Sequence, residues 1–131
     1  MPLGRRKKLE KLLSLHGKLS ASHEARRTAC LAAAAAARCD AETLKSRFDA
    51  PGSMFALFPE LYHERIARAQ ARETEERQRA DEEGRALARL AMREKALKRH
   101  LDQERAWEAR MGEERALLEW VETRVSQAPA S

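Results

Sequence analysis

Apolar residues recur at helical spacing along the first third of the chain, and no proline interrupts them between about Arg5 and Phe48. A recurrence every three or four residues places apolar side chains on one face of an α-helix. The sequence therefore predicts one long helix over about residues 5–48. Several of the heptad positions expected to face a partner helix are polar, which weakens that face. Read as heptads, these positions are Leu9, Leu12, His16, Leu19, His23, Arg26, Cys30, Ala33, Ala37, Asp40 and Leu44.

A turn is predicted over residues 49–57, because Pro51 cannot continue a helix and Gly52 supplies the left-handed conformation that a reversal needs. Pro59 suits the first turn of a second helix, where its missing N–H costs nothing. We predict this helix over about residues 58–125, followed by a frayed tail at residues 126–131. Its apolar heptad positions are Ile66, Ala69, Ala80, Leu87, Leu90, Leu97, Leu101, Met111, Leu118 and Val125.

The predicted fold class is all-α, with two long helices that form an antiparallel coiled-coil hairpin as a single domain over residues 1–131. A rise of about 1.5 Å per residue gives about 66 Å for the first helix and about 100 Å for the second, which therefore overhangs the first. If the chain reverses at Pro51 and Gly52, Leu9 should lie near Leu97, and the chain beyond Leu101 has no partner within the hairpin.

Apolar residues nevertheless continue along this overhang, which we expect to bind another protein or a second copy of the chain. They are Trp107, Met111, Leu117, Leu118, Trp120, Val121 and Val125.

The aromatic residues Phe48, Phe55, Phe58 and Tyr62 gather around the turn, where Met54, Leu57 and Leu61 join them. Such a cluster can seal the end of the hairpin or form a docking tip, because exposed aromatic side chains dominate contact energies. The sequence leaves both interpretations open, and both can hold at once.

The excess of basic residues lies in the first part of the chain. The net charge is +5, and residues 1–50 hold 11 Lys or Arg against 5 Asp or Glu, whereas residues 51–131 hold 15 against 16. The run Arg5, Arg6, Lys7 and Lys8 is either a solvated terminus or a surface for phosphate or an acidic protein. Nucleic-acid binding is the less favoured class, because no stacking aromatics accompany the basic residues.

The sequence offers no chemistry of a catalytic or metal site. His16, His23 and Cys30 recur every seven residues, but neighbours are then about 10.5 Å apart along a helix, too far to share a zinc ion. No phosphate-binding loop or nucleophile elbow is present. We therefore predict a protein that is not an enzyme and that uses no cofactor, metal or small-molecule substrate. Two free cysteines, with no apolar segment long enough for a signal or a membrane span, favour a cytoplasmic location.

Two stretches of the second helix resemble the FliJ family of flagellar type III export proteins. They are Arg93-Glu94-Lys95-Ala96-Leu97-Lys98-Arg99-His100-Leu101 and Glu113-Glu114-Arg115-Ala116-Leu117-Leu118-Glu119-Trp120-Val121. The opening segment Leu9-Glu10-Lys11-Leu12-Leu13-Ser14-Leu15 is similar to the start of that family, and two long helices match its architecture. Glu119-Trp120 stands where the family commonly has an Asp-Glu pair, and the alanine tract differs from the family.

The resemblance implies a helper of flagellar protein export that binds the hexameric export ATPase, the cytoplasmic domain of the export gate and substrate chaperones. It also implies a cytoplasmic location, with peripheral association at the inner membrane left open. The hypothesis places the ATPase at the overhang and the basic N-terminus, and the gate or a chaperone at the aromatic tip. The alternatives are a structural coiled-coil scaffold that self-associates through the overhang, and a basic helical protein associated with nucleic acid.

Overall fold

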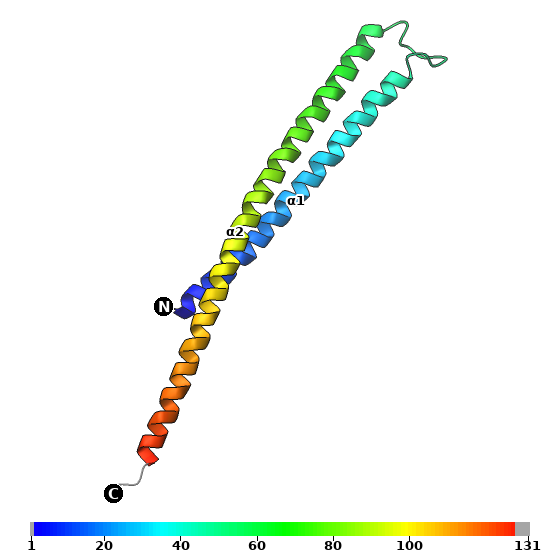
Figure 1. Cartoon of the computed structure of the whole chain (residues 1–131). Coiled ribbons are helices and arrows are strands. Elements are labelled where there is room, and N and C mark those ends of the chain that lie inside the picture. Colours follow the sequence, from blue (N-terminus) through cyan, green and yellow to red (C-terminus); the bar gives the residue numbers. More distant parts are fainter. Residues whose placement is uncertain (1, 128–131) are drawn as a thin grey trace. The chain divides into compact units, whose positions relative to one another are not determined.

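The computed structural model of the chain describes residues 2–127, which form two α-helices, α1 (Pro2–Ser46) and α2 (Pro59–Gln127) (Figure 1). The part of the chain that the structure describes contains no strand. α1 and α2 form a helical hairpin, so the predicted fold class is confirmed, with the second helix the longer. Of the predicted frayed tail, Ser126 and Gln127 belong to α2, and residues 128–131 lie outside the described residues.

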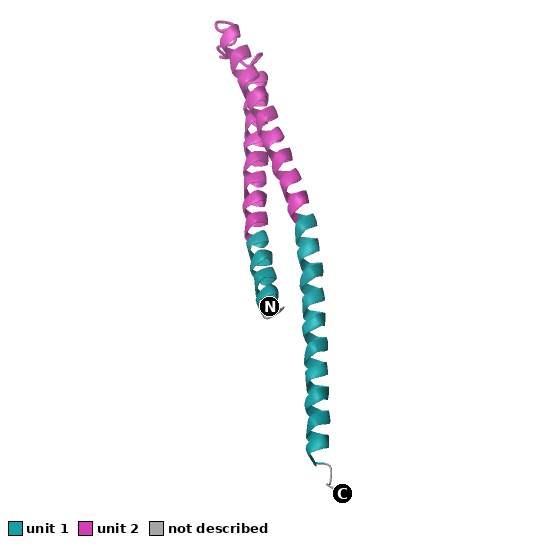
Figure 2. Ribbon diagram, turned by 90° about the vertical axis from the view of Figure 1, so that its left-hand side faces the viewer, with its two compact units in different colours: residues 1–17, 91–131 teal, residues 18–90 magenta. Residues whose placement is uncertain are grey.

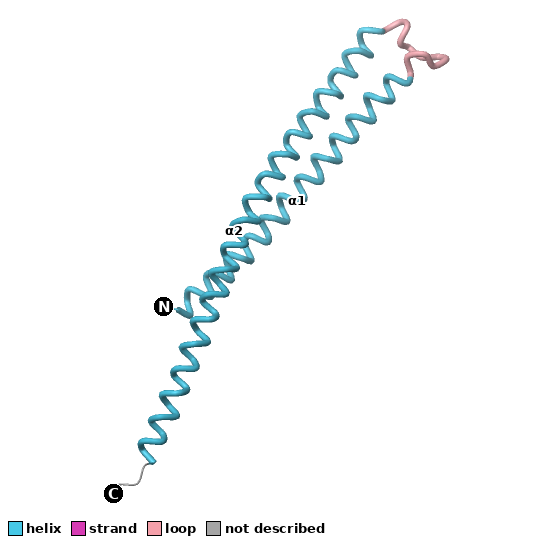
Figure 3. The backbone as a smooth tube through the Cα atoms, viewed as in Figure 1, coloured by secondary structure: helices cyan, strands magenta, loops and turns pink. Residues whose placement is uncertain are grey.

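Each helix begins at a proline, because the first turn of a helix has no use for the N–H that proline lacks. α1 ends at Ser46, whose hydroxyl donates to the Thr43 carbonyl oxygen at 2.7 Å. The loop of residues 47–58, drawn in pink in Figure 3, then reverses the chain. Gly52 has φ 78° there, which is the left-handed conformation expected of it.

The hairpin divides into two compact units (Figure 2). Unit 1 contains residues 2–17 of α1 and residues 91–127 of α2, and unit 2 contains residues 18–90. Within each unit a segment of α1 packs against a segment of α2 of opposite direction. Two paired helices do not enclose a shared core, so each residue contacts only the residues at the same height on the neighbouring helix. The packing contacts therefore separate into successive groups along the length of the hairpin.

Most of the buried residues of unit 2 are alanines. Ala34, Ala37 and Ala41 of α1 are buried, together with Ile66, Ala80 and Leu90 of α2. Alanine lets two helix backbones approach closely, but it removes little apolar surface from water, and a buried methylene contributes only about 0.8 kcal/mol. The pairing of α1 with α2 therefore depends on many small contacts in one fixed heptad phase.

The heptad phase predicted for α1 was wrong at Leu12, Leu19, Arg26 and Asp40, which are exposed, whereas the predicted Ala33 is half-buried. Leu12 and Leu19 are 43% and 51% exposed, and Asp40 is also exposed, whereas Ala34 and Ala41 are buried. Apolar spacings of three and four residues fit both the predicted contact positions of α1 and those of the structure, so spacing alone does not decide between them. The phase in the structure places Ala41 rather than Asp40 against α2, so no carboxylate loses its water. The buried and half-buried positions of α1 are Arg6, Leu9, Leu13, His16, Ser20, His23, Cys30, Ala33, Ala34, Ala37, Ala41 and Leu44.

The heptad predicted for α2 agrees with the burial as far as Met111. Ile66, Ala80, Leu90 and Leu101 are buried, and the heptad positions between them are half-buried. In unit 1, Arg5 pairs with Glu104 and Arg105 pairs with Glu10. These ion pairs place Leu9 close to the level of Leu101, about one turn beyond the predicted Leu97.

A pair of neighbouring substitutions tests this heptad phase. Ala41→Asp should lower the free energy of unfolding by about 3 kcal/mol, because it buries an unpaired carboxylate between the helices. Asp40→Ala should change that free energy by no more than about 0.5 kcal/mol, because Asp40 is exposed. Urea denaturation followed by circular dichroism at 222 nm measures both. Equal effects of the two substitutions would show that the phase is wrong.

Candidate functional site

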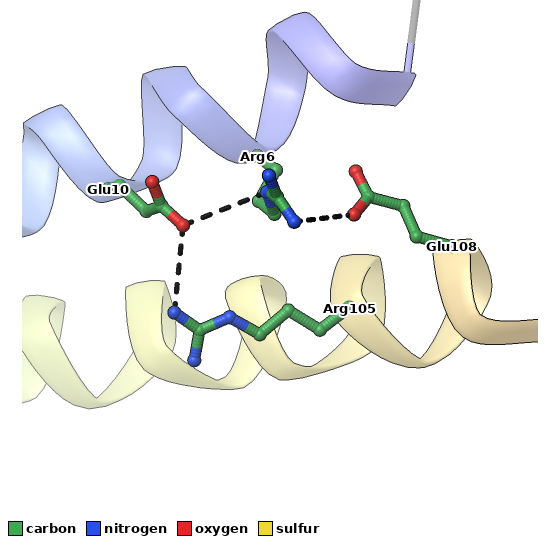
Figure 4. A network of polar contacts seen from close by, with 4 residues as sticks. All are labelled: Arg6, Glu10, Arg105 and Glu108. Carbon is green, nitrogen blue, oxygen red and sulfur yellow. Dashed lines mark hydrogen bonds and ion pairs between the residues drawn. The ribbon is translucent and has the colours of Figure 1, made fainter.

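The basic N-terminus lies partly against α2 in unit 1. Arg6 Nη1 donates to Glu108 Oε2 at 3.0 Å, and Arg6 Nε lies 3.7 Å from Glu10 Oε1 (Figure 4). Arg105 of α2 reaches the same Glu10 carboxylate at 3.6 Å. These four side chains form a network between the two helices. Since they remain partly exposed, each pair contributes at most about 1 kcal/mol, and the network fixes the register more than it adds stability.

The four basic residues predicted as one binding surface therefore separate. Arg5 Nε lies 3.2 Å from Glu104 Oε1, so both arginines of the run pair with α2. Lys7 and Lys8 are exposed and form no ion pair with a described residue. Of the four basic residues of this run, only Lys7 and Lys8 are free to attract a partner.

Beyond its contacts with Arg6, α2 continues without a partner in unit 1, and every residue from 112 to 127 is exposed. We call residues 109–127 the α2 end. At about 100° per residue, five predicted side chains fall within an arc of about 80° on one face of the helix. They are Trp107, Met111, Leu118, Val121 and Val125. The surface beside them is hollowed into a groove of about 450 Å³.

Trp120 does not belong to this face. It points to the other side of the helix, where the Arg124 guanidinium lies 4.8 Å from the centre of a Trp120 ring. A cation over an indole is a local stabilising contact. The structure thus brings five of the seven predicted residues of this region together, and Leu117 and Trp120 lie outside their arc.

The face of the α2 end continues the heptad that α2 uses against α1. Positions 101, 104, 108 and 111 are buried or half-buried, and the next members of the repeat, Arg115, Leu118, Glu122 and Val125, are exposed. The same pattern of apolar and charged residues thus extends past the last residue of α1 that could cover it. An uncovered heptad is a surface for another helix.

The aromatic cluster at the turn has an inner and an outer part. Phe48 and Phe55 stack with ring centroids 4.1 Å apart, and Tyr62 and His63 pack edge-on against both rings. Phe58 is 50% exposed, and the neighbouring Met54 and Leu61 are exposed to a similar extent. Leu57 is more exposed than these three residues. Phe48, Phe55 and Tyr62 therefore seal the end of unit 2, and Phe58 is the predicted aromatic residue left for a partner.

Sequence reasoning missed a groove on unit 2 that is rich in arginine. Arg47 from the loop after α1 and Arg65, Arg68 and Arg72 from α2 line it, together with Asp40. The signal was present in the sequence, because residues 65, 68 and 72 are spaced to lie on one face of a helix. We call this surface the arginine groove.

His16, His23 and Cys30 of α1 have structural partners. His23 Nδ1 contacts the Glu83 carboxylate, and His16 Nδ1 donates to the Leu12 carbonyl oxygen at 3.0 Å. Burial raises the pKa of the Cys30 thiol, and the nearby Glu76 carboxylate raises it further. Within residues 2–127 no three His, Cys, Asp or Glu side chains gather as a metal ion would require.

No protein-family model matches the sequence, and no curated protein and no solved structure matches the chain. Within the described residues, neither helix contains a stretch long and apolar enough to cross a membrane.

The two parts of the aromatic cluster differ in what they contribute to stability. Phe55→Ala should lower the free energy of unfolding by about 2 kcal/mol, because it removes the ring that Phe48, Tyr62 and His63 pack against. Phe58→Ala should change it by no more than about 0.5 kcal/mol. Thermal denaturation of the two variants makes the comparison, and a larger loss for Phe58→Ala would contradict the assignment.

The two cysteines should differ in reactivity. Cys30 faces α2 with a raised pKa, so at neutral pH it holds little thiolate, whereas Cys39 is exposed. Iodoacetamide should alkylate the Cys39→Ser variant about fivefold more slowly than the Cys30→Ser variant at pH 7.5. The alkylation rate of Cys30 in the Cys39→Ser variant should keep rising at pH values above those at which an ordinary thiol is fully ionised. Equal rates in the folded variants would place Cys30 outside the helix pair.

Proposed function

We propose that this chain is a helical docking protein of the FliJ type, without catalytic activity, that binds the hexameric ATPase of flagellar protein export through the α2 end. The observation that carries the proposal is the exposure of every residue from 112 to 127 on a helix whose heptad continues. An amphipathic helix with one uncovered face binds by placing that face in an apolar groove or beside another helix.

The sequence resemblance supports this choice of partner. The stretch Glu113–Val121, which resembles the end of the FliJ family, lies wholly within the α2 end. The other similar stretch of α2, Arg93–Leu101, includes Leu97 and Leu101, which pack within unit 1. The first stretch is thus exposed for binding, and the second supports the helix that presents it.

The energetics favour a contact made by a few anchors. Complete burial of a Met, Leu or Val side chain contributes about 1.5–3 kcal/mol, so Met111, Leu118 and Val125 can offset the loss of rotational and translational freedom on association. Glu114 and Glu122 flank these residues and would set the register and the rate of encounter rather than the affinity.

The remaining surfaces have smaller parts in the proposal. Lys7 and Lys8 would add electrostatic attraction to an acidic surface of the ATPase, since Arg5 and Arg6 are paired within unit 1. Phe58 and Leu57, at the exposed part of the turn, would contact the export gate or a substrate chaperone.

Replacement of the anchors tests the proposal. The triple variant Met111→Ser, Leu118→Ser, Val125→Ser should bind the export ATPase at least about 100-fold more weakly than the unmodified chain, because three apolar contacts are lost. Its helicity should remain nearly unchanged. Isothermal titration calorimetry with the purified ATPase gives the dissociation constants.

Met92→Ser is the matched control, because Met92 is a 75% exposed apolar residue of α2 outside the α2 end. It should bind with unchanged affinity. If the triple variant binds as well as the control does, or if the unmodified chain does not bind the ATPase, the proposal is wrong.

A further inference from the structure

The arginine groove presents four guanidinium groups from α2 and the loop after α1 to solvent. Arg47, Arg65 and Arg72 form no ion pair with another residue in the part of the chain that the structure describes. Arg68 pairs with Glu64, its neighbour one turn earlier in α2, and Asp40 is the one acidic residue in the lining. Positive charge without internal compensation attracts an acidic partner.

The floor of the groove is apolar. Ala37 and Ala69 supply small side chains, Leu44 supplies a larger one, and the arginines stand at the rim. An isolated anion would gain nothing from this floor. A third helix would gain from both parts of the surface, because its apolar face can rest on the alanines while its carboxylates reach the arginines.

The α2 end has the composition that such a surface requires. Between residues 113 and 122 it carries four glutamates, Glu113, Glu114, Glu119 and Glu122, and a single basic residue, Arg115. The same ten residues include Leu117, Leu118 and Val121, and they are exposed without exception.

From this complementarity we infer that the α2 end of one copy docks in the arginine groove of a second copy. Glu114 and Glu122 meet the arginines of the rim, and Leu118 and Val121 cover the floor. Arg115, the basic residue of the segment, is offset by Asp40, the acidic residue of the groove. The two contacting surfaces differ, so the contact is heterologous and each docked copy presents a free end or a free groove to the next.

This inference uses the same α2 end as the proposed function but does not depend on the identity of the export partner. A partner that binds the apolar face of the α2 end would compete with a second copy for it. Self-association and partner binding are therefore mutually exclusive, and the arginine groove affects only the first.

Two variants with reversed charge test the docking. A groove variant, Arg65→Glu with Arg72→Glu, keeps its α2 end, and an end variant, Glu114→Arg with Glu122→Arg, keeps its groove. Sedimentation velocity of the full chain in 50 mM salt measures the mass of each. The unmodified chain should form oligomers that grow with concentration, and each variant alone should associate at least about tenfold more weakly.

Mixing the two variants gives the sharpest result. The end of the groove variant can enter the groove of the end variant, and the reversed end and the reversed groove also attract each other. The mixture should therefore associate nearly as strongly as the unmodified chain, although neither variant does so alone. Raising the salt to 500 mM should weaken the association of the unmodified chain by at least about tenfold. The control, Arg89→Glu with Arg93→Glu, reverses two exposed α2 charges outside the groove and should associate as the unmodified chain does.

Circular dichroism confirms that the variants remain helical, and Arg65→Gln with Arg72→Gln serves instead if charge reversal disturbs folding. An unmodified chain that stays monomeric at all concentrations would overturn the inference. So would a groove variant that associates as strongly as the unmodified chain, which would indicate pairing between two α2 ends. At concentrations too low for self-association, the groove variant should bind the export ATPase as the unmodified chain does, so failure of the docking is distinguishable from failure of the proposed function.

Discussion

The packing of α1 against α2 along a line of buried alanines is the constraint on which the rest of the structure depends. Ala34, Ala37 and Ala41 are the buried residues of α1, and any larger or charged residue there would force the helices apart. Alanine gives little hydrophobic stabilisation, so specificity comes from keeping the charged residues out of the line. The heptad phase follows from this requirement, and it leaves Leu12 and Leu19 exposed.

A second consequence concerns the glutamates that share the contact line. Glu76, Glu83 and Glu108 occupy heptad positions of α2 and are half-buried, and each has a cation or a histidine within reach. A carboxylate in such a position is costly unless it is paired. Glu83 and Glu108 pair with residues of α1, so these two contacts fix the register of the helices. The α2 end keeps the same alternation of apolar and charged residues but has no α1 segment to pair with, which makes it suitable for binding another helix.

Much of this could be predicted from the sequence. The two helices, the reversal near Gly52 and the heptad of α2 up to Met111 follow from helical spacing and from the positions of the prolines. The phase of α1 could not be fixed, because Leu12 and Leu13 are both apolar and either satisfies the repeat. The choice depends on which of Asp40 and Ala41 meets α2, which is a property of the packed pair.

Other features of the candidate surfaces depend on contacts between residues distant in sequence. The run from Arg5 to Lys8 reads as four free cations, but Glu104 and Glu108 lie about 100 positions away and pair with two of them. The arginine groove could not be predicted from spacing alone, because Arg47 belongs to the loop after α1 and the other three arginines belong to α2. The aromatic residues at the turn share one short segment, yet only the packed structure separates the stacked pair Phe48 and Phe55 from the exposed Phe58.

Hydrogen exchange measured by mass spectrometry on dilute protein tests most directly whether α2 is paired along one part and unpaired along the other. Amides of residues 62–90 should exchange slowly and together with those of residues 30–44, because the helices of unit 2 open as a pair. Amides of residues 112–127 should exchange much faster, as expected of a helix without a packing partner. Equal protection of residues 112–127 and 62–90 at the lowest concentration would contradict the account, since it would mean that another part of the same chain covers the α2 end.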